Sequence, residues 1–233
     1  NEGVLLKNVN GIKIAFIGYT KGVNNEKLPE GSEFCVDLLY QDYWTEYKEI
    51  NTDGIVKSVK AAKALDPDVI VAMLHWGSEW DTTVGSTQQE IADLMLKNGV
   101  DVILGSHPHV VGPMKEVPVT TVDGEEKTCF VAYSLGNFFS SPDSQKYDYA
   151  MESVILNLEF TKNGKTGDTS LTGIQYTPLY ILKTESEAEG VRYQVVPIRS
   201  AISNNLFPDM ESTFTDAIAH LRTNTDSDYD SGK

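Results

Sequence analysis

Two unbroken apolar runs of strand length stand out along the chain, and each leads into a histidine. They are DVIVAMLHW, residues 68–76, and DVILGSH, residues 101–107. Between them lies QQEIADLMLKNG, residues 88–99, whose apolar positions recur with helical spacing and which ends in glycine. Parallel strands that are buried on both faces have continuous apolar runs, and a helix usually joins them. The pattern therefore predicts a strand, helix, strand unit.

The rest of the chain is richer in strand patterns than in helical ones. Residues 4–20 form two β-rich runs around Asn10-Gly11, which is a strong hairpin signal, and further strand patterns follow Val117. Helices are expected over residues 55–65 and 213–221. We therefore expect residues 1–233 to form a single α/β domain, with a parallel or mixed part first and an antiparallel part later.

The irregular segments carry fewer structural signals. Residues 21–51 contain Gly, Pro and several aromatics, and are expected to form a long loop with at most one short helix. Cys35 and Cys129 are far apart and lack CxxC spacing, which argues against a thiolate zinc site. We expect free, buried thiols, although a disulfide is an open alternative. His220, at a helix end, is interpreted as structural, and the acidic tail, residues 226–233, is expected to be disordered.

The charge balance excludes one class of partner. The chain has 34 acidic and 19 basic residues, a net charge of -15, which opposes the phosphate contacts that nucleic-acid binding requires. An anionic substrate would need a local positive charge, and a bound metal ion is one way to supply it. The sequence lacks an apolar run long enough to span a bilayer and begins without a signal-peptide pattern, so an upstream leader, anchor or longer region is left open.

Three of the four histidines lie at the predicted carboxyl ends of two strands. Ligands bind at this edge of open α/β sheets, so His75, His107 and His109 are expected to converge. An extended backbone would place His107 and His109 on the same side, and Pro108 would stiffen the segment between them. Neutral imidazoles suit Zn, Mn, Fe or Ni. The alternative is a turn whose histidines bind only the backbone.

These segments carry a family resemblance. LHWGSEW, then QQEIADLMLKNGVDVILGSHPHVVGPMKEV and VAYSLGNFF, resemble the HWG, GxHPH and YSLGNF motifs of the bacterial CapA capsule synthesis proteins. This family makes poly-γ-glutamate capsule and is related to the calcineurin-like metallophosphoesterases. The resemblance runs in order from about Ile12 to Phe139, and it is vague beyond Ser140.

The resemblance implies a mixed β sandwich flanked by helices, in four α/β/β/α layers, with a two-metal centre at the sheet edge. It implies that His75 and His107 bind one divalent ion (Mn, Fe, Zn or Ni) and that His109 binds the other. Family members also carry Gly-Asp, Asn-Leu-Glu and Asn-Asn-His motifs in an amino-terminal half, and these do not occur here in the family's order. We therefore expect the chain to be the carboxyl-terminal portion of such a domain.

Other residues in the matched segments are weaker candidates. Glu79 could orient a metal ligand, or it could be a solvated loop residue; Ser106 and Asn137 could line the pocket, although an Asn after Gly often serves a turn. Ser134 lacks the surrounding pattern of a nucleophile.

Two functions compete on these observations. The first is a metal-dependent phosphoesterase-like protein of capsule or cell-envelope polymer biosynthesis. By resemblance it would lie at the extracellular face of the membrane or be secreted, with an anionic polymer or phosphoester as substrate and capsule-synthesis membrane proteins as partners. The alternative is a non-catalytic envelope protein that binds polymer or a partner through the aromatic loop from Tyr40 to Tyr47.

Overall fold

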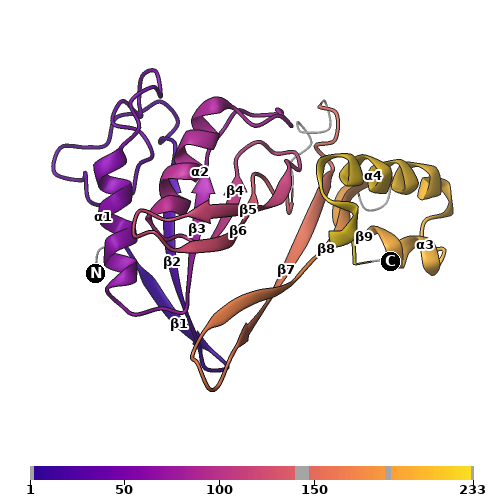
Figure 1. The fold of residues 1–233 in the computed structure, drawn as a ribbon. Coiled ribbons are helices and arrows are strands. Elements are labelled where there is room, and N and C mark those ends of the chain that lie inside the picture. The colour runs from indigo at the N-terminus through magenta and orange to yellow at the C-terminus, as the bar shows by residue number, and fades with distance from the viewer. Residues whose placement is uncertain (1–2, 140–146, 187–189, 232–233) are drawn as a thin grey trace.

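A mixed six-stranded sheet forms the centre of the first half of the chain (Figure 1). The computed structural model describes residues 3–139, 147–186 and 190–231. The strand order is β1-β2-β3-β4-β6-β5; β2, β3, β4 and β6 run parallel, whereas the outer strands β1 and β5 are antiparallel to their neighbours. The strands are β1 (Leu5–Val9), β2 (Ile12–Thr20), β3 (Val69–His75), β4 (Val102–Ser106), β5 (Met114–Thr120) and β6 (Glu126–Ala132). The predicted hairpin and the strand, helix, strand unit are both confirmed.

Two helices cover one face of this sheet, α1 (Thr52–Lys63) and α2 (Ser86–Asn98). The apolar positions of each helix, such as Ile55 and Ile91, are fully buried against β2, β3 and β4. The helix α2 ends at Gly99, whose φ of 124° is accessible to glycine and strained for other residues.

A second, antiparallel sheet covers the other face (Figure 1). It contains β7 (Glu152–Lys162), β8 (Thr169–Ser186) and β9 (Gly190–Pro197). On its far side pack α3 (Ile198–Ser203) and α4 (Glu211–Asn224), with the short 3-10 turns η2 (Pro208–Met210) and η3 (Ser227–Tyr229) nearby. The molecule thus has four layers, in the order helices, sheet, sheet and helices, and one apolar cluster lies between each pair of neighbouring layers. This is the expected α/β class, a sandwich of two sheets flanked by helices.

The segment 21–51 differs from a free loop. It forms no helix. An isolated β-bridge joins its Leu38 to Thr20 at the end of β2, and a second one joins Tyr40 to Ile50 within the segment. Tyr40 and Tyr43 are buried in the core beneath it. Tyr40 and Tyr43 therefore anchor the segment to the core.

Two expectations about buried and exposed residues need correction. Both cysteines are free, but only Cys129 is buried; Cys35 lies exposed in the segment 21–51. Residues 226–231 of the acidic tail are held against the fold, because the buried carboxylate of Asp230 pairs with Arg199 and Arg222; residues 232 and 233 lie outside the described part of the chain.

His220 lies in the last turns of α4 in a structural environment, as expected. Its Nδ1 is 2.6 Å from the buried carboxylate of Glu152, and its ring stacks on Tyr149. Across the described residues, no helix is both long and apolar enough to cross a membrane.

Candidate metal centre

The parallel strands bring the three predicted histidines to one edge of the sheet. Thr20 ends β2 opposite His75, and His75 ends β3 opposite Ser106 of β4. His107 follows Ser106 directly, so the two strand ends place the rings of His75 and His107 4.5 Å apart between centroids. The ring of His109 lies 6.1 Å from that of His107.

The structure adds Glu79 to this cluster. Glu79, His107 and His109 each offer one ligand atom, and these three atoms lie within 4.8 Å of one another. The carboxylate Oε1 of Glu79 is 3.9 Å from Nε2 of His109. His75 is next to His107 but outside this group of three. The expected triad of histidines is thus a cluster of three imidazoles and one carboxylate, in which each ligand role stays a prediction.

The backbone of the HPH segment is not extended. His107 and His109 have φ values of 96° and 62°, in the left-handed region, so the chain turns at Pro108 and still leaves one ligand atom of each ring within 4.8 Å of the other. The prediction of an extended backbone was wrong, because a hydrogen bond from a separate loop holds this segment in a turn, and the local sequence does not reveal that bond. Trp80 donates its backbone N–H to the Pro108 carbonyl at 2.8 Å, which holds this turn in place.

Asn137 fixes the protonation pattern of His109. Its Nδ2 donates to the Ala150 carbonyl at 3.2 Å, which directs Oδ1 toward His109 Nδ1 at 2.8 Å. An amide oxygen only accepts, so Nδ1 of His109 must carry the proton. In the neutral ring the lone pair is then on Nε2, the nitrogen beside Glu79, which is the arrangement that a metal ligand requires.

Thr20 does the same for His75. Its hydroxyl has a single proton, which it donates to the Gly22 carbonyl at 3.0 Å. The hydroxyl can then only accept from His75 Nδ1, which is 3.2 Å away. His75 is thus held with its Nε2 unprotonated, the same tautomer as His109.

The electrostatics keep two of these rings neutral. Burial lowers the pKa of His107 to about 4, and the neighbouring His75 and Lys21 act in the same direction. Burial, together with the charges of His109 and Lys21, also lowers the pKa of His75. Neutral imidazole is the form that binds a metal, so the donor set fits a divalent metal ion.

Sequence reasoning missed Trp80. Its ring is stacked between His109, with centroids 4.8 Å apart, and Tyr147, at 4.0 Å. Trp80 has a φ of 63°, and no pattern in the sequence marks that conformation. Of the weaker candidates, Asn137 contacts a histidine, whereas the Ser106 hydroxyl donates to the Leu74 carbonyl at 3.2 Å and Ser134 to the Val110 carbonyl at 2.7 Å.

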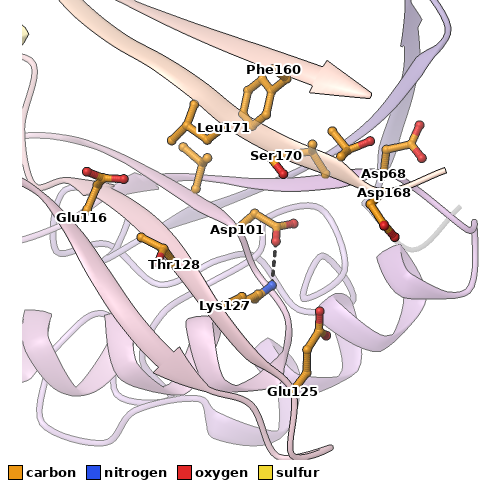
Figure 2. A pocket seen from close by; sticks show the side chains of 13 residues that line it. Asp68, Asp101, Glu116, Glu125, Lys127, Thr128, Phe160, Asp168, Ser170 and Leu171 are labelled. Atoms are coloured by element: carbon orange, nitrogen blue, oxygen red, sulfur yellow. Dashed lines mark hydrogen bonds and ion pairs between the residues drawn. The ribbon is translucent and has the colours of Figure 1, made fainter. Parts of the chain in front are cut away.

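A cavity of about 570 Å³ lies away from the histidines, at the opposite edge of the six-stranded sheet and between the two sheets (Figure 2). Acidic side chains line it, but two of them have structural partners. Asp101 accepts from the Ile70 N–H at 2.7 Å and pairs with Lys127 at 2.6 Å, and Asp68 accepts from the Lys13 N–H and pairs with Lys162. These carboxylates accept from N–H groups near the starts of β2 and β3, so we do not assign a functional site here.

Comparison with known proteins identifies the class. The family model described as "Bacterial capsule synthesis protein PGA_cap" matches residues 1–142, which include the three histidines, Glu79 and Asn137. The chain belongs to this family of bacterial capsule synthesis proteins.

Two curated relatives agree with the family. The chain is 33% identical over 170 residues to the PGA biosynthesis protein CapA of Bacillus subtilis (strain 168), covering 71% of the chain and 37% of the relative. It is 26% identical over 168 residues to the capsule biosynthesis protein CapA of Bacillus anthracis, covering 70% and 35%. The chain thus spans about a third of the length of these relatives.

Similarity to solved structures is lower. A hypothetical protein from Thermus thermophilus aligns with a TM-score of 0.39 and 11% identity, covering 83% of this chain and 61% of that one. The calcineurin-like phosphoesterase YfkN from Bacillus subtilis aligns with a TM-score of 0.37 and 14% identity, covering 94% and 58%. At these scores neither alignment carries an argument about function.

Proposed function

We propose that this chain carries a divalent-metal site for phosphoester hydrolysis and that it acts in capsule or cell-envelope polymer biosynthesis. The observation that supports the site best is the pair of hydrogen bonds at the sheet edge. Thr20 and Asn137 engage Nδ1 of His75 and of His109, so Nε2 of each ring is the nitrogen left for a metal, beside the neutral ring of His107. Histidines that only stabilised loops would not need matching tautomers.

The residues at this edge have distinct proposed roles. His75, His107 and His109 would hold the ion, and Glu79 would bind it directly or orient His109. A bound ion would supply a water of lowered pKa and a positive charge for the phosphoryl oxygen. Trp80 and Asn137 keep His109 in position, since its ring is stacked on one and hydrogen-bonded by the other. The described donors suffice for one ion.

The test uses two histidine variants. Purified protein should bind about one Mn²⁺ or Zn²⁺ per chain by calorimetry and hydrolyse bis-p-nitrophenyl phosphate. His107→Gln should lose both properties. His220→Gln is the matched control, because it removes a histidine that lies in a separate hydrogen-bond network. A protein that binds no divalent ion and hydrolyses no phosphoester contradicts the proposal.

The biological role is a proposal from the family. The name of the Bacillus subtilis relative refers to PGA biosynthesis, so we propose poly-γ-glutamate as the polymer, the extracellular face of the membrane as the location, and capsule-synthesis membrane proteins as partners. Deletion of the gene, followed by measurement of surface polymer, tests the role. Unchanged polymer in the deletion strain contradicts it.

The non-catalytic alternative has less support. It depends on the aromatic residues from Tyr40 to Tyr47, and Tyr40 and Tyr43 are buried in the core. Retention of poly-γ-glutamate binding by His107→Gln and after chelation, with no hydrolysis by the unsubstituted protein, would favour this alternative.

A further inference from the structure

A cavity of about 390 Å³ opens directly beside the histidine cluster. His75, His107 and Glu79 form one wall, and the segment after β2 forms the other with Lys21, Asn24 and Asn25. A metal held by the histidines would therefore face this segment. The proposed reaction needs a place for the substrate's phosphoryl group, and this cavity adjoins the metal ligands.

Lys21 is placed at this wall by the strand register. It follows the last residue of β2, and its backbone N–H donates to the His75 carbonyl at 2.7 Å. Its ammonium donates to the Gly77 carbonyl at 2.8 Å and lies 4.9 Å from the centroid of the Tyr47 ring. An ammonium has three donors, so this geometry leaves further donor capacity toward the cavity.

Lys21 differs from the other lysines that are partly buried. Among the described residues these are Lys13 and Lys127, and each forms an ion pair with an aspartate. Among the described residues Lys21 forms none within 4.0 Å, although it is half-buried beside Glu79. A cation without a paired carboxylate next to a metal site would repel the metal, unless an anion lies between them.

The amides beside Lys21 add neutral donors. Asn25 accepts from the Tyr47 hydroxyl through Oδ1, which directs its NH₂ group away from that ring. Both Asn24 and Asn25 have a left-handed backbone, with φ values of 53° and 60°, which brings two successive amide side chains to the cavity wall. Gly22 allows the close approach of this turn, because a Cβ there would lie 2.6 Å from the Tyr43 carbonyl.

We propose that Lys21, with the side-chain amides of Asn24 and Asn25, forms a phosphoryl-binding subsite that holds a non-bridging oxygen of the phosphoester beside the metal. This inference rests on the proposed function and names how its substrate is held. One ammonium and two amides would bind an anion whose other oxygen contacts the metal, so the anion would screen the two positive charges from each other.

The test measures binding of inorganic phosphate by calorimetry, with Mn²⁺ present at saturation. Lys21→Met should weaken phosphate binding at least tenfold, while the Kd for Mn²⁺ measured without phosphate stays the same or decreases, since a repelling charge is gone. Lys21→Arg should retain most of the phosphate affinity. The matched control is Lys97→Met, which makes the same charge change on the exposed surface of α2 and should leave phosphate binding unchanged.

Several results would overturn the subsite. They are absence of phosphate binding by the unsubstituted protein, an unchanged phosphate Kd in Lys21→Met, or an equal loss in Lys97→Met. A parallel titration with glutarate tests a carboxylate ligand; if Lys21→Met weakens glutarate binding and not phosphate binding, the phosphoryl assignment is wrong.

If phosphate binding depends on Lys21 but no phosphoester is hydrolysed, the subsite stands and the hydrolytic function fails. If a phosphoester is hydrolysed but the phosphate Kd does not change in Lys21→Met, the hydrolytic function stands and the subsite fails.

Discussion

The two edges of the six-stranded sheet both collect polar side chains, but they use them differently. At the amino-terminal edge, Asp68 and Asp101 accept hydrogen bonds from strand N–H groups and pair with lysines, so their capacity is consumed within the fold (Figure 2). At the carboxyl-terminal edge, His75 and His109 each use Nδ1 for a hydrogen-bond partner in the protein, so Nε2 is the nitrogen that a metal could bind.

This difference shows that cavity size is a poor guide to the site. The acidic cavity is the larger of the two, at about 570 Å³ against about 390 Å³. The smaller cavity is distinguished by side chains beside it whose hydrogen-bonding capacity is not fully used within the fold. Thr20 and Asn137 orient two of these side chains, His75 and His109. A metal site needs ligands that are positioned by the fold but not satisfied by it.

The largest predicted effect is on metal binding at the carboxyl-terminal edge. His107→Ala removes a proposed metal ligand, and we expect the Kd for Zn²⁺ to increase at least about 100-fold, the upper end of the range for losing a residue that only orients a ligand. Calorimetry at neutral pH measures this change. An increase below threefold would mean that His107 is not a ligand.

The next prediction contrasts two carboxylates, of which only that of Glu152 is buried. Asp68 is stabilised as a charge and its pKa is lowered, first by the Lys162 ammonium, whereas burial raises the pKa of Glu152 to about 8. A raised carboxyl pKa means that the folded protein binds the Glu152 proton more tightly than the unfolded protein does. The stability that Glu152 contributes is therefore complete below the ordinary pKa of about 4.5 and is lost as the pH rises through about 8. Stability should therefore fall by a few kcal/mol between pH 5 and pH 9.

The control for this pH dependence is Glu152→Gln, which cannot ionise. Its free energy of unfolding, from urea denaturation at several pH values, should change much less over the same range. A variant whose pH dependence equals that of the unsubstituted protein would show that another group is responsible.

Substitution at the amino-terminal edge should affect stability alone. Asp101→Ala removes the acceptor of the Ile70 N–H and the partner of Lys127, and we expect a loss of about 2 kcal/mol of unfolding free energy, typical of hydrogen bonds to a charged group. The Kd for Zn²⁺ should stay within twofold of the unsubstituted value. Weakened metal binding in this folded variant would contradict the separation of the two edges.

The smallest predicted effect is that of orientation. Asn137→Ala removes the hydrogen bond that fixes the His109 tautomer, and should weaken Zn²⁺ binding about tenfold, or about 1.4 kcal/mol. Asn137→Asp keeps an acceptor at the same place and should bind at least as well as the unsubstituted protein. Equal losses in both variants would indicate a packing role.

Much of the fold could be predicted because its signals are local. The apolar runs of β3 and β4 and the helical spacing of α2 each lie within one segment, and the rule that parallel strands share a carboxyl edge then places His75 beside His107. No distant contact had to be known for these steps.

The remaining features depend on contacts between segments far apart in the sequence. Glu79 reaches His109 because Trp80 takes a left-handed conformation and bonds the Pro108 carbonyl. The tail is ordered because Asp230 meets Arg199 across 31 positions of sequence. Neither contact leaves a periodic pattern, so neither could be derived from the residue order.

The most direct test of the account is anomalous diffraction from a crystal soaked in Zn²⁺. We predict a peak at the carboxyl-terminal edge, about 2.0 to 2.1 Å from a ring nitrogen of His107 and from Nε2 of His75 or His109. A peak in the acidic cavity around Asp101, with none beside the three histidines, would contradict the account.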